Sequence, residues 1–207
     1  MRVLFACFFA FGLIFSFNPG VLHAQQYYPN GNPKAEGGKD ALGKQGQWRY
    51  YYPSGVLNAV EHYSDNKLNG QSRHYYPNGQ PESIENWRGD VLIDSAYYYY
   101  ESGQLKRAGA YHFGLYQGVW LSYFENGQLK YEGAYHLGLP SGLWNVYNES
   151  GVLIQTGSYD QGKEDGFWQF FDEAGRPTYE GSYESGREVG DWYRYSPKGE
   201  KKKYKAY

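Results

Sequence analysis

Short apolar and aromatic runs alternate along the chain with clusters of turn-forming residues. Residues 144–147 (WNVY) form one such run, which ends at the turn cluster 148–151 (NESG). Residues 152–159 form a second run, which ends at the turn 160–162. Strand-like runs of this length joined by glycine-containing turns are typical of β-hairpins. No stretch keeps a helical period for more than two turns, so the pattern predicts an all-β protein.

The hairpin pattern repeats every 24 residues without insertion or deletion. One position of the repeat is glycine in every unit: Gly55, Gly79, Gly103, Gly127, Gly151, Gly175 and Gly199. A second position is tryptophan in most units, namely Trp48, Trp120, Trp144, Trp168 and Trp192, and is replaced by Ser72 and Ala96 in the others. The repeats fill residues 46–207, and a partial N-terminal repeat fills residues 25–45. We expect these glycines and tryptophans to hold the repeats together.

The turn residues predict how consecutive runs connect. Asn78-Gly79 and Asn126-Gly127 are strong hairpin signals because both residue types tolerate positive φ. Hairpins in series give about 15 or 16 antiparallel strands, each ~4.8 Å from the next. We therefore predict an elongated single-layer antiparallel meander of 24-residue β-hairpin repeats.

The composition of residues 25–207 changes the expected source of stability. This part contains only 22 Leu, Ile and Val residues, but it carries all 25 Tyr and all 6 Trp. Such a chain does not build an ordinary aliphatic core or a helical bundle. Aromatic rings that pack between neighbouring hairpins must replace that core.

The first 24 residues have the pattern of a signal peptide. Met1-Arg2 is followed by an apolar run over residues 3–17, then Asn18-Pro19-Gly20, and Ala24 before a polar segment. The run is shorter than the ~20 residues that span a bilayer. We therefore predict signal peptide 1–24 and an exported protein, periplasmic, cell-surface or secreted. Cleavage removes Cys7, the single cysteine, and leaves a near-neutral chain, which excludes disulfides and argues against nucleic-acid binding.

Two segments share one specific motif. Residues 131–144 and 179–192 both spell Y-E-G-x-Y-x-x-G-x-x-x-G-x-W, and Trp120, Tyr123, Gly127 and Leu129 supply a W-x-x-Y-x-x-x-G-x-L half. The array resembles the MORN repeat, in the bacterial variant of YwqK-like proteins. The resemblance implies an elongated twisted β-hairpin sheet with a binding or scaffolding role. The YwqK-like label implies an antitoxin that neutralises a toxin by binding it.

The sequence carries no recognisable catalytic or metal-binding motif. His112 and His136 share one repeat position, which puts them two strands or ~10 Å apart, too far to ligate one metal ion. The chain lacks a G-x-S-x-G elbow, a phosphate-binding loop and an H-E-x-x-H motif. We therefore predict no enzymatic activity, no cofactor and no metal site.

The aromatic surplus suggests a binding surface. Neighbouring tyrosines in 50–52 and 97–100 place rings on both faces of a strand, and exposed rings stack on proteins or sugars. The candidate binding surface is Tyr50, Tyr52, Tyr76, Tyr98, Tyr100 and Phe124. We predict an exported scaffold that binds a protein partner. The alternatives are a YwqK-like antitoxin or immunity protein and a cell-surface glycan or lipid binder.

Overall fold

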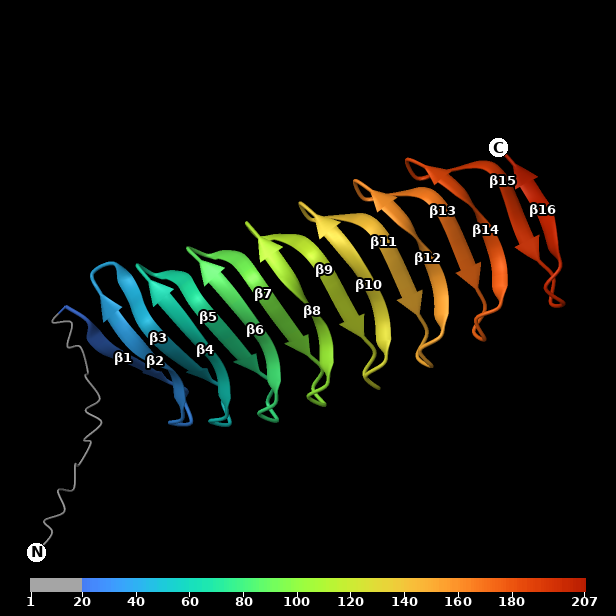
Figure 1. Cartoon of the computed structure of the whole chain (residues 1–207). Helices are drawn as coiled ribbons and strands as arrows, with labels where there is room; N and C mark the ends of the chain where they lie inside the picture. The colour runs from blue at the N-terminus through green and yellow to red at the C-terminus, as the bar shows by residue number, and fades with distance from the viewer. Residues whose placement is uncertain (1–19) are drawn as a thin grey trace, which may run out of the picture.

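The computed structural model describes residues 20–207 as one open antiparallel sheet of sixteen strands (Figure 1). The strands are β1 (Leu22–Tyr27), β2 (Pro33–Asp40), β3 (Gly43–Tyr51), β4 (Leu57–Ser64), β5 (Lys67–Tyr75), β6 (Pro81–Arg88), β7 (Val91–Tyr99), β8 (Leu105–His112), β9 (Leu115–Tyr123), β10 (Leu129–His136), β11 (Leu139–Tyr147), β12 (Leu153–Asp160), β13 (Lys163–Phe171), β14 (Pro177–Glu184), β15 (Arg187–Tyr195) and β16 (Lys201–Ala206). Their order in the sheet is their order in the chain. The predicted all-β, single-layer meander is confirmed.

The predicted signal peptide overlaps the described part of the chain only at its end. Residues 1–19 lie outside the described residues, and residues 22–24 belong to β1, which pairs with β2. Within residues 20–207, no helix is long and apolar enough to cross a membrane. Cleavage after residue 24 therefore stays a prediction.

The first turn of each repeat is a three-residue loop. Gly79 has φ +85° and donates its N–H to the Tyr76 carbonyl at 2.8 Å. The hairpin predicted at Asn78-Gly79 is present, and of this pair only Gly79 has a positive φ. A three-residue hairpin loop needs only its last residue in that region. Asn78 acts through its side chain instead, which accepts from the Gln80 N–H and donates to the Glu101 carbonyl of the next hairpin.

From the β4–β5 hairpin onwards, the second turn of each repeat is a two-residue turn in which both residues have positive φ. The values are +52° and +65° at Asp65 and Asn66, and +49° and +83° at Leu137 and Gly138. Such a turn matches the right-handed twist of the strands that it joins. The Gly138 N–H also donates to the Tyr116 carbonyl at 2.9 Å, which ties this turn to the preceding hairpin.

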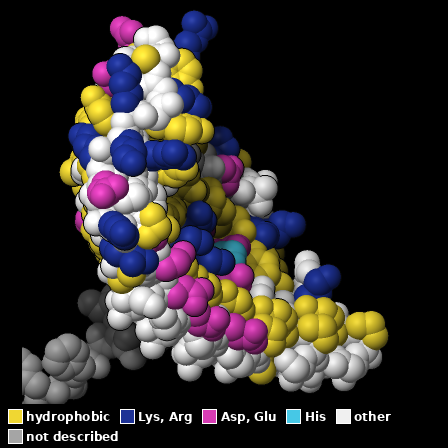
Figure 2. All heavy atoms as spheres, turned by 90° about the vertical axis from the view of Figure 1, so that its right-hand side faces the viewer, with side chains coloured by type: hydrophobic (Ala, Val, Ile, Leu, Met, Phe, Trp, Pro, Cys, Tyr) yellow, Lys and Arg dark blue, Asp and Glu magenta, His cyan; other side chains and the backbone are white. Residues whose placement is uncertain are grey.

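The two faces of the sheet differ in burial. We call the face that carries the repeat tryptophans the inner face, and the opposite one the outer face. Trp120 and Trp168 are almost fully buried, and Ala96 has no exposed surface. Figure 2 shows a hollow in which hydrophobic side chains gather. Because the sheet twists and curves, a single layer buries side chains along its own inner face.

Candidate functional site

One row across the inner face alternates glycine and tryptophan from β8 to β15. Gly133 pairs with Trp120 and Trp144, and Trp144 pairs in turn with Gly157. A Cβ added to Gly133 would lie 2.1 Å from a ring carbon of Trp144, and one added to Gly157 would lie 2.0 Å from Trp168. Only glycine lets each indole lie flat against the preceding strand.

The tryptophans form a continuous ladder with the inner tyrosines. Edge-to-face contacts join Tyr135 to Trp144 at 5.1 Å, Trp144 to Tyr159 at 5.6 Å and Tyr159 to Trp168 at 5.1 Å between ring centroids. The Trp144 N–H donates to the Ala134 carbonyl at 3.1 Å. Trp48, Trp120 and Trp168 each donate in the same way to the carbonyl ten residues earlier. The rings and their glycines therefore join each hairpin to the next.

The same row changes its chemistry in β4–β7. Glu61 and Glu85 stand at the glycine position, and Ser72 and Ala96 stand at the tryptophan position. We call these four residues the acidic interruption. Where Ser72 or Ala96 replaces the tryptophan, a glutamate also replaces the glycine of the preceding strand. A glycine is needed only where an indole lies over it.

Tyrosine hydroxyls hold the two carboxylates of the acidic interruption. The Tyr63 hydroxyl donates to Glu61 at 2.5 Å. Burial, together with the hydrogen bond to Glu61, raises the pKa of Tyr63. Burial and hydrogen bonds to Tyr111 and Glu85 raise the pKa of Tyr98 in the same way. Both phenols therefore remain protonated at neutral pH.

Cationic side chains lie on the aromatic rings at both ends of the acidic interruption. The Lys44 ammonium lies 4.5 Å from the Tyr63 ring centroid and donates to the Tyr50 hydroxyl at 2.6 Å. The Arg107 guanidinium lies 4.1 Å from the Tyr98 ring centroid. These contacts are cation–π interactions, and the His74 imidazole lies 3.5 Å from the Glu61 carboxylate. The interruption is therefore a packed polar network of the fold rather than an open acidic site.

The predicted binding residues fall into two structural groups. Tyr50 and Tyr98 lie on the inner face in that network, where Tyr98 exchanges a hydrogen bond with Tyr111 at 3.0 Å. Tyr52, Tyr76 and Tyr100 form a line beside the first turns, and Phe124 continues it without a hydroxyl. Each of the three hydroxyls donates to the carbonyl 23 residues later, at 2.8–2.9 Å. All six side chains are half-buried, and their part in binding stays a prediction.

The outer face carries exposed apolar side chains that the sequence analysis did not select. Val119, Leu143 and Phe167 occupy one repeat position on β9, β11 and β13, and they are 63%, 60% and 53% exposed. Earlier units have Gln47, Gln71 and Ser95 at this position. The switch from polar to apolar at one repeat position is the sequence signal that could have identified this surface.

Two second turns add apolar side chains to that surface. Phe113 and Leu137 are 75% and 57% exposed although both have φ +49°, a region that bulky residues rarely enter. Leu115 and Leu139 follow them in the next strands and are also exposed. We call this set the apolar belt: Phe113, Leu115, Val119, Leu137, Leu139, Leu143 and Phe167.

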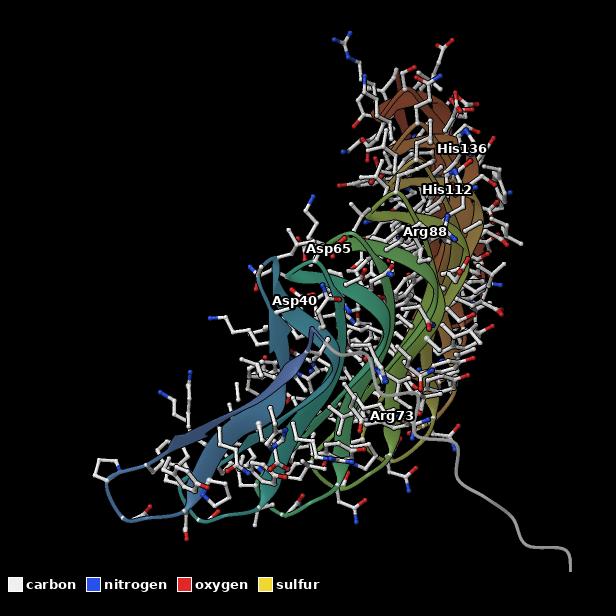
Figure 3. The ribbon with its side chains drawn as sticks, turned by 90° about the vertical axis from the view of Figure 1, so that its left-hand side faces the viewer. Asp40, Asp65, Arg73, Arg88, His112 and His136 are labelled. Atoms are coloured by element: carbon white, nitrogen blue, oxygen red, sulfur yellow. The ribbon has the colours of Figure 1, made fainter. Side chains whose placement is uncertain are left out.

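A surface pocket and a row of charged side chains lie beside the apolar belt. The pocket has a volume of about 410 Å³, and Leu137, Leu139 and Ser141 line it. His112 and His136 follow Asp40, Asp65 and Arg88 along the edge of the sheet that carries the second turns (Figure 3). Residues 20–207 contain no group of three His, Cys, Asp or Glu side chains placed to hold a metal ion.

Part of the hairpin array is similar to a known repeat family. Four segments match the MORN repeat variant. They are residues 22–37, 44–65, 68–88 and 116–136. Two of these MORN segments contain residues of the acidic interruption, so the match includes units that lack the repeat tryptophan. No curated protein matches the chain.

Solved structures give only distant similarities. One is the TcdB2-TccC3-Cdc42 complex, with 16% identity over 84% of this chain and 12% of that chain, at a TM-score of 0.23. Another is the Tc holotoxin pore of Photorhabdus luminescens, with 16% identity over 84% of this chain and 11% of that chain, at a TM-score of 0.22. The chain spans about one eighth of the length of these chains, and such TM-scores do not define a shared fold.

Proposed function

We propose that the protein is an exported, non-enzymatic MORN-repeat scaffold that binds a protein partner through the apolar belt. The observation that carries this proposal is the row of exposed Val119, Leu143 and Phe167, flanked by apolar turn residues. Contiguous exposed apolar surface on a soluble protein typically marks an interaction site. This surface lies on the outer face, away from the glycine–tryptophan row that stabilises the array.

The backbone of the second turns supports the same assignment. Phe113 and Leu137 occupy turn positions where other units have Asp65, Gln161 or Ser185. A bulky side chain in the left-handed region costs about 1–2 kcal/mol relative to a residue that tolerates it. Phe113 packs on the His112 ring, and both Phe113 and Leu137 remain largely exposed, which supports a role for them in contacting a partner.

The spacing of the belt indicates the shape of that partner. Equivalent residues on β9, β11 and β13 lie two strands apart, which is ~10 Å in a regular sheet. Apolar side chains repeated at this spacing fit an extended surface, such as a long helix or the edge of a second domain. The resemblance to YwqK-like proteins makes a toxin one class of partner to test, in an antitoxin or immunity role.

The decisive experiment compares two variants with the wild-type chain. The belt variant carries Leu137→Asn, Leu143→Asn and Phe167→Gln, and the control variant carries Gln161→Asn at the same turn position in the next unit. A photo-crosslinker at position 139 is used with envelope extract, and cross-linked proteins are identified by mass spectrometry. We expect the wild type and the control to capture the same protein in similar amounts. The belt variant should capture at least about tenfold less of it.

Two controls separate binding from folding. Leu137→Asn places in the turn a residue that tolerates positive φ, so the belt variant should not melt at a lower temperature than the wild type. Equal capture by all three chains would refute a binding role for the belt. The mass of the protein recovered from the envelope tests signal-peptide cleavage separately, because cleavage after Ala24 leaves a chain that begins at Gln25.

A further inference from the structure

The last hairpin departs from the pattern of the others in its register. In most hairpins joined by a first turn, the register shift lies beside that turn, at the end of the strand. In the β15–β16 pair the shift lies deeper. Trp192 pairs with Lys205 and Tyr193 pairs with Lys203, so Tyr204 is an extra residue between them. β16 therefore contains a bulge within the strand.

The bulge brings the Tyr204 ring to the inner face. Its centroid lies 5.8 Å from that of Tyr179 on β14, with the two rings at 64°. Tyr179 itself pairs with Phe170, which stacks on Trp168 of the glycine–tryptophan row. Tyr179 and Tyr204 are 43% and 47% exposed, unlike the rings in the middle of the inner face. Bulges near sheet edges often redirect a side chain in this way, next to a functional site.

These two tyrosines form part of the wall of a cavity of about 290 Å³. The other aromatic walls are Phe170, Tyr183 and Trp192. The volume lies near the lower end of the ~300–1,000 Å³ range of small-molecule sites, and it suits a ligand of a single ring. Aromatic walls of this kind bind the apolar face of a ligand by stacking.

The polar groups of the cavity include both a hydrogen-bond acceptor and hydrogen-bond donors. The Glu188 carboxylate lies 3.7 Å from the Lys205 ammonium, and both side chains line the cavity. The buried Trp192 N–H has no hydrogen-bond partner, whereas the equivalent N–H groups of Trp48, Trp120 and Trp168 are all bonded. This N–H has almost no accessible surface, so the polar groups that a ligand in the cavity can reach are those of Glu188 and Lys205.

We propose that this cavity binds one sugar ring, that is, a neutral polyhydroxylated ring with an apolar C–H face. The C–H face would stack on Tyr179 and Tyr204, and the hydroxyls would donate to Glu188 and accept from Lys205. A cationic ligand would have to displace Lys205 from Glu188, and an anionic ligand would face the Glu188 carboxylate. A neutral ring with hydroxyls uses both groups without breaking their ion pair.

This site is separate from the apolar belt. The belt lies on the outer face of β9–β13 and on the turns beside β9 and β11, whereas the cavity lies on the inner face between β13 and β16. A sugar bound there would attach one end of the scaffold to a glycan while the belt holds a protein. If the sugar site is refuted, the proposed protein binding by the apolar belt is unaffected, and the reverse also holds.

The test uses the full chain and saturation-transfer NMR with glucose, galactose and N-acetylglucosamine, each at millimolar concentration, and with tetramethylammonium as a cationic probe. We expect transfer to the C–H protons of at least one sugar and none to tetramethylammonium. Tyr204→Ala should weaken sugar binding by about tenfold or more, because it removes one stacking face. Tyr97→Ala, which removes a similarly exposed tyrosine from β7, should change it by less than about twofold.

Two further variants keep the test independent of folding. Tyr204→Phe retains the ring and should bind sugar as the wild type does, even if Tyr204→Ala disturbs the edge strand. Glu188→Gln keeps the shape of the side chain and should weaken sugar binding severalfold. Transfer to none of the three sugars, sugar binding that Tyr204→Ala leaves unchanged, or transfer to tetramethylammonium alone would each overturn the proposal.

Discussion

Two regions of the same sheet pack the central row of their inner face with different residues. In β8–β15 each indole lies over a glycine of the preceding strand, in an unbroken aromatic ladder. In β4–β7 the glycine is a glutamate and the tryptophan is Ser72 or Ala96. Both residues of the pair change together, and the strand pairing continues through both regions. The hairpin repeat therefore requires a matched pair at this row rather than an aromatic ring as such.

The largest expected effect comes from breaking one matched pair in the regular region. Gly157→Ala puts a Cβ 2.0 Å from the Trp168 ring and should lower the free energy of unfolding by about 2–3 kcal/mol. Glu85→Ala, at the same row position in β6, removes a carboxylate beside the Tyr98 hydroxyl and should cost about 1 kcal/mol. Urea denaturation of both variants measures the difference. Equal losses would show that the glycine is not required by the indole.

A swap between the two regions tests the pairing rule directly. Ser72→Trp alone forces an indole against Glu61 and should be destabilising. Combined with Glu61→Gly, it recreates the regular pair. The double variant should therefore lose about 1–3 kcal/mol less free energy of unfolding than the two single variants lose together. A double-mutant cycle from urea denaturation gives this coupling. Additive single effects would mean that the two positions are independent.

The tyrosine line beside the first turns offers a smaller comparison. The Tyr100 hydroxyl donates to the Tyr123 carbonyl at 2.9 Å, whereas Phe124, one unit later, has no hydroxyl. Tyr100→Phe should cost about 1 kcal/mol, and Phe124→Tyr should gain up to about 1 kcal/mol by reaching the Tyr147 carbonyl. Thermal unfolding compares the two. A loss of stability in Phe124→Tyr would show that the two regions differ in backbone geometry here.

The smallest effect is confined to alkaline pH. Burial raises the pKa of Tyr111 and of Tyr135 to about 12, and it also raises the pKa of Tyr63 and Tyr98. Because the folded pKa lies above the unfolded value of ~10, this stability is complete below pH 10 and is lost as the pH rises towards 12 and beyond.

Absorbance titration of the phenols measures this set of tyrosines. Glu85→Gln should lower the pKa of Tyr98, because it removes a negative charge beside the hydroxyl. It should not move the titration of Tyr135, which Glu85 does not influence. An unchanged titration of Tyr98 would show that the carboxylate does not act on this phenol.

The sequence predicted the fold far better than the functional surfaces. The 24-residue period and its glycine positions specify hairpins, strand order and a single layer, because local turn chemistry decides them. The conformation of Asn78 was not predictable from the pair alone, since loop length decides which turn type forms. The sequence shows Leu137 as an apolar residue at a turn position, but it does not show that this side chain is exposed. The position of the Tyr204 ring on the inner face could not be predicted, because the repeat only weakly specifies the register of an edge strand that has one partner.

The one-after-another order of the strands has a mechanical consequence. Within residues 20–207, each strand pairs in the sheet only with its neighbours in the chain, and the hydrogen bonds between turns reach only the next hairpin, so the sheet closes no long loop. Tension applied between the two termini would open the protein one hairpin at a time from its ends. Each 24-residue unit would then release roughly 80 Å of extended chain. A protein held at one end and loaded at the other would lengthen in equal steps and close again as the load falls.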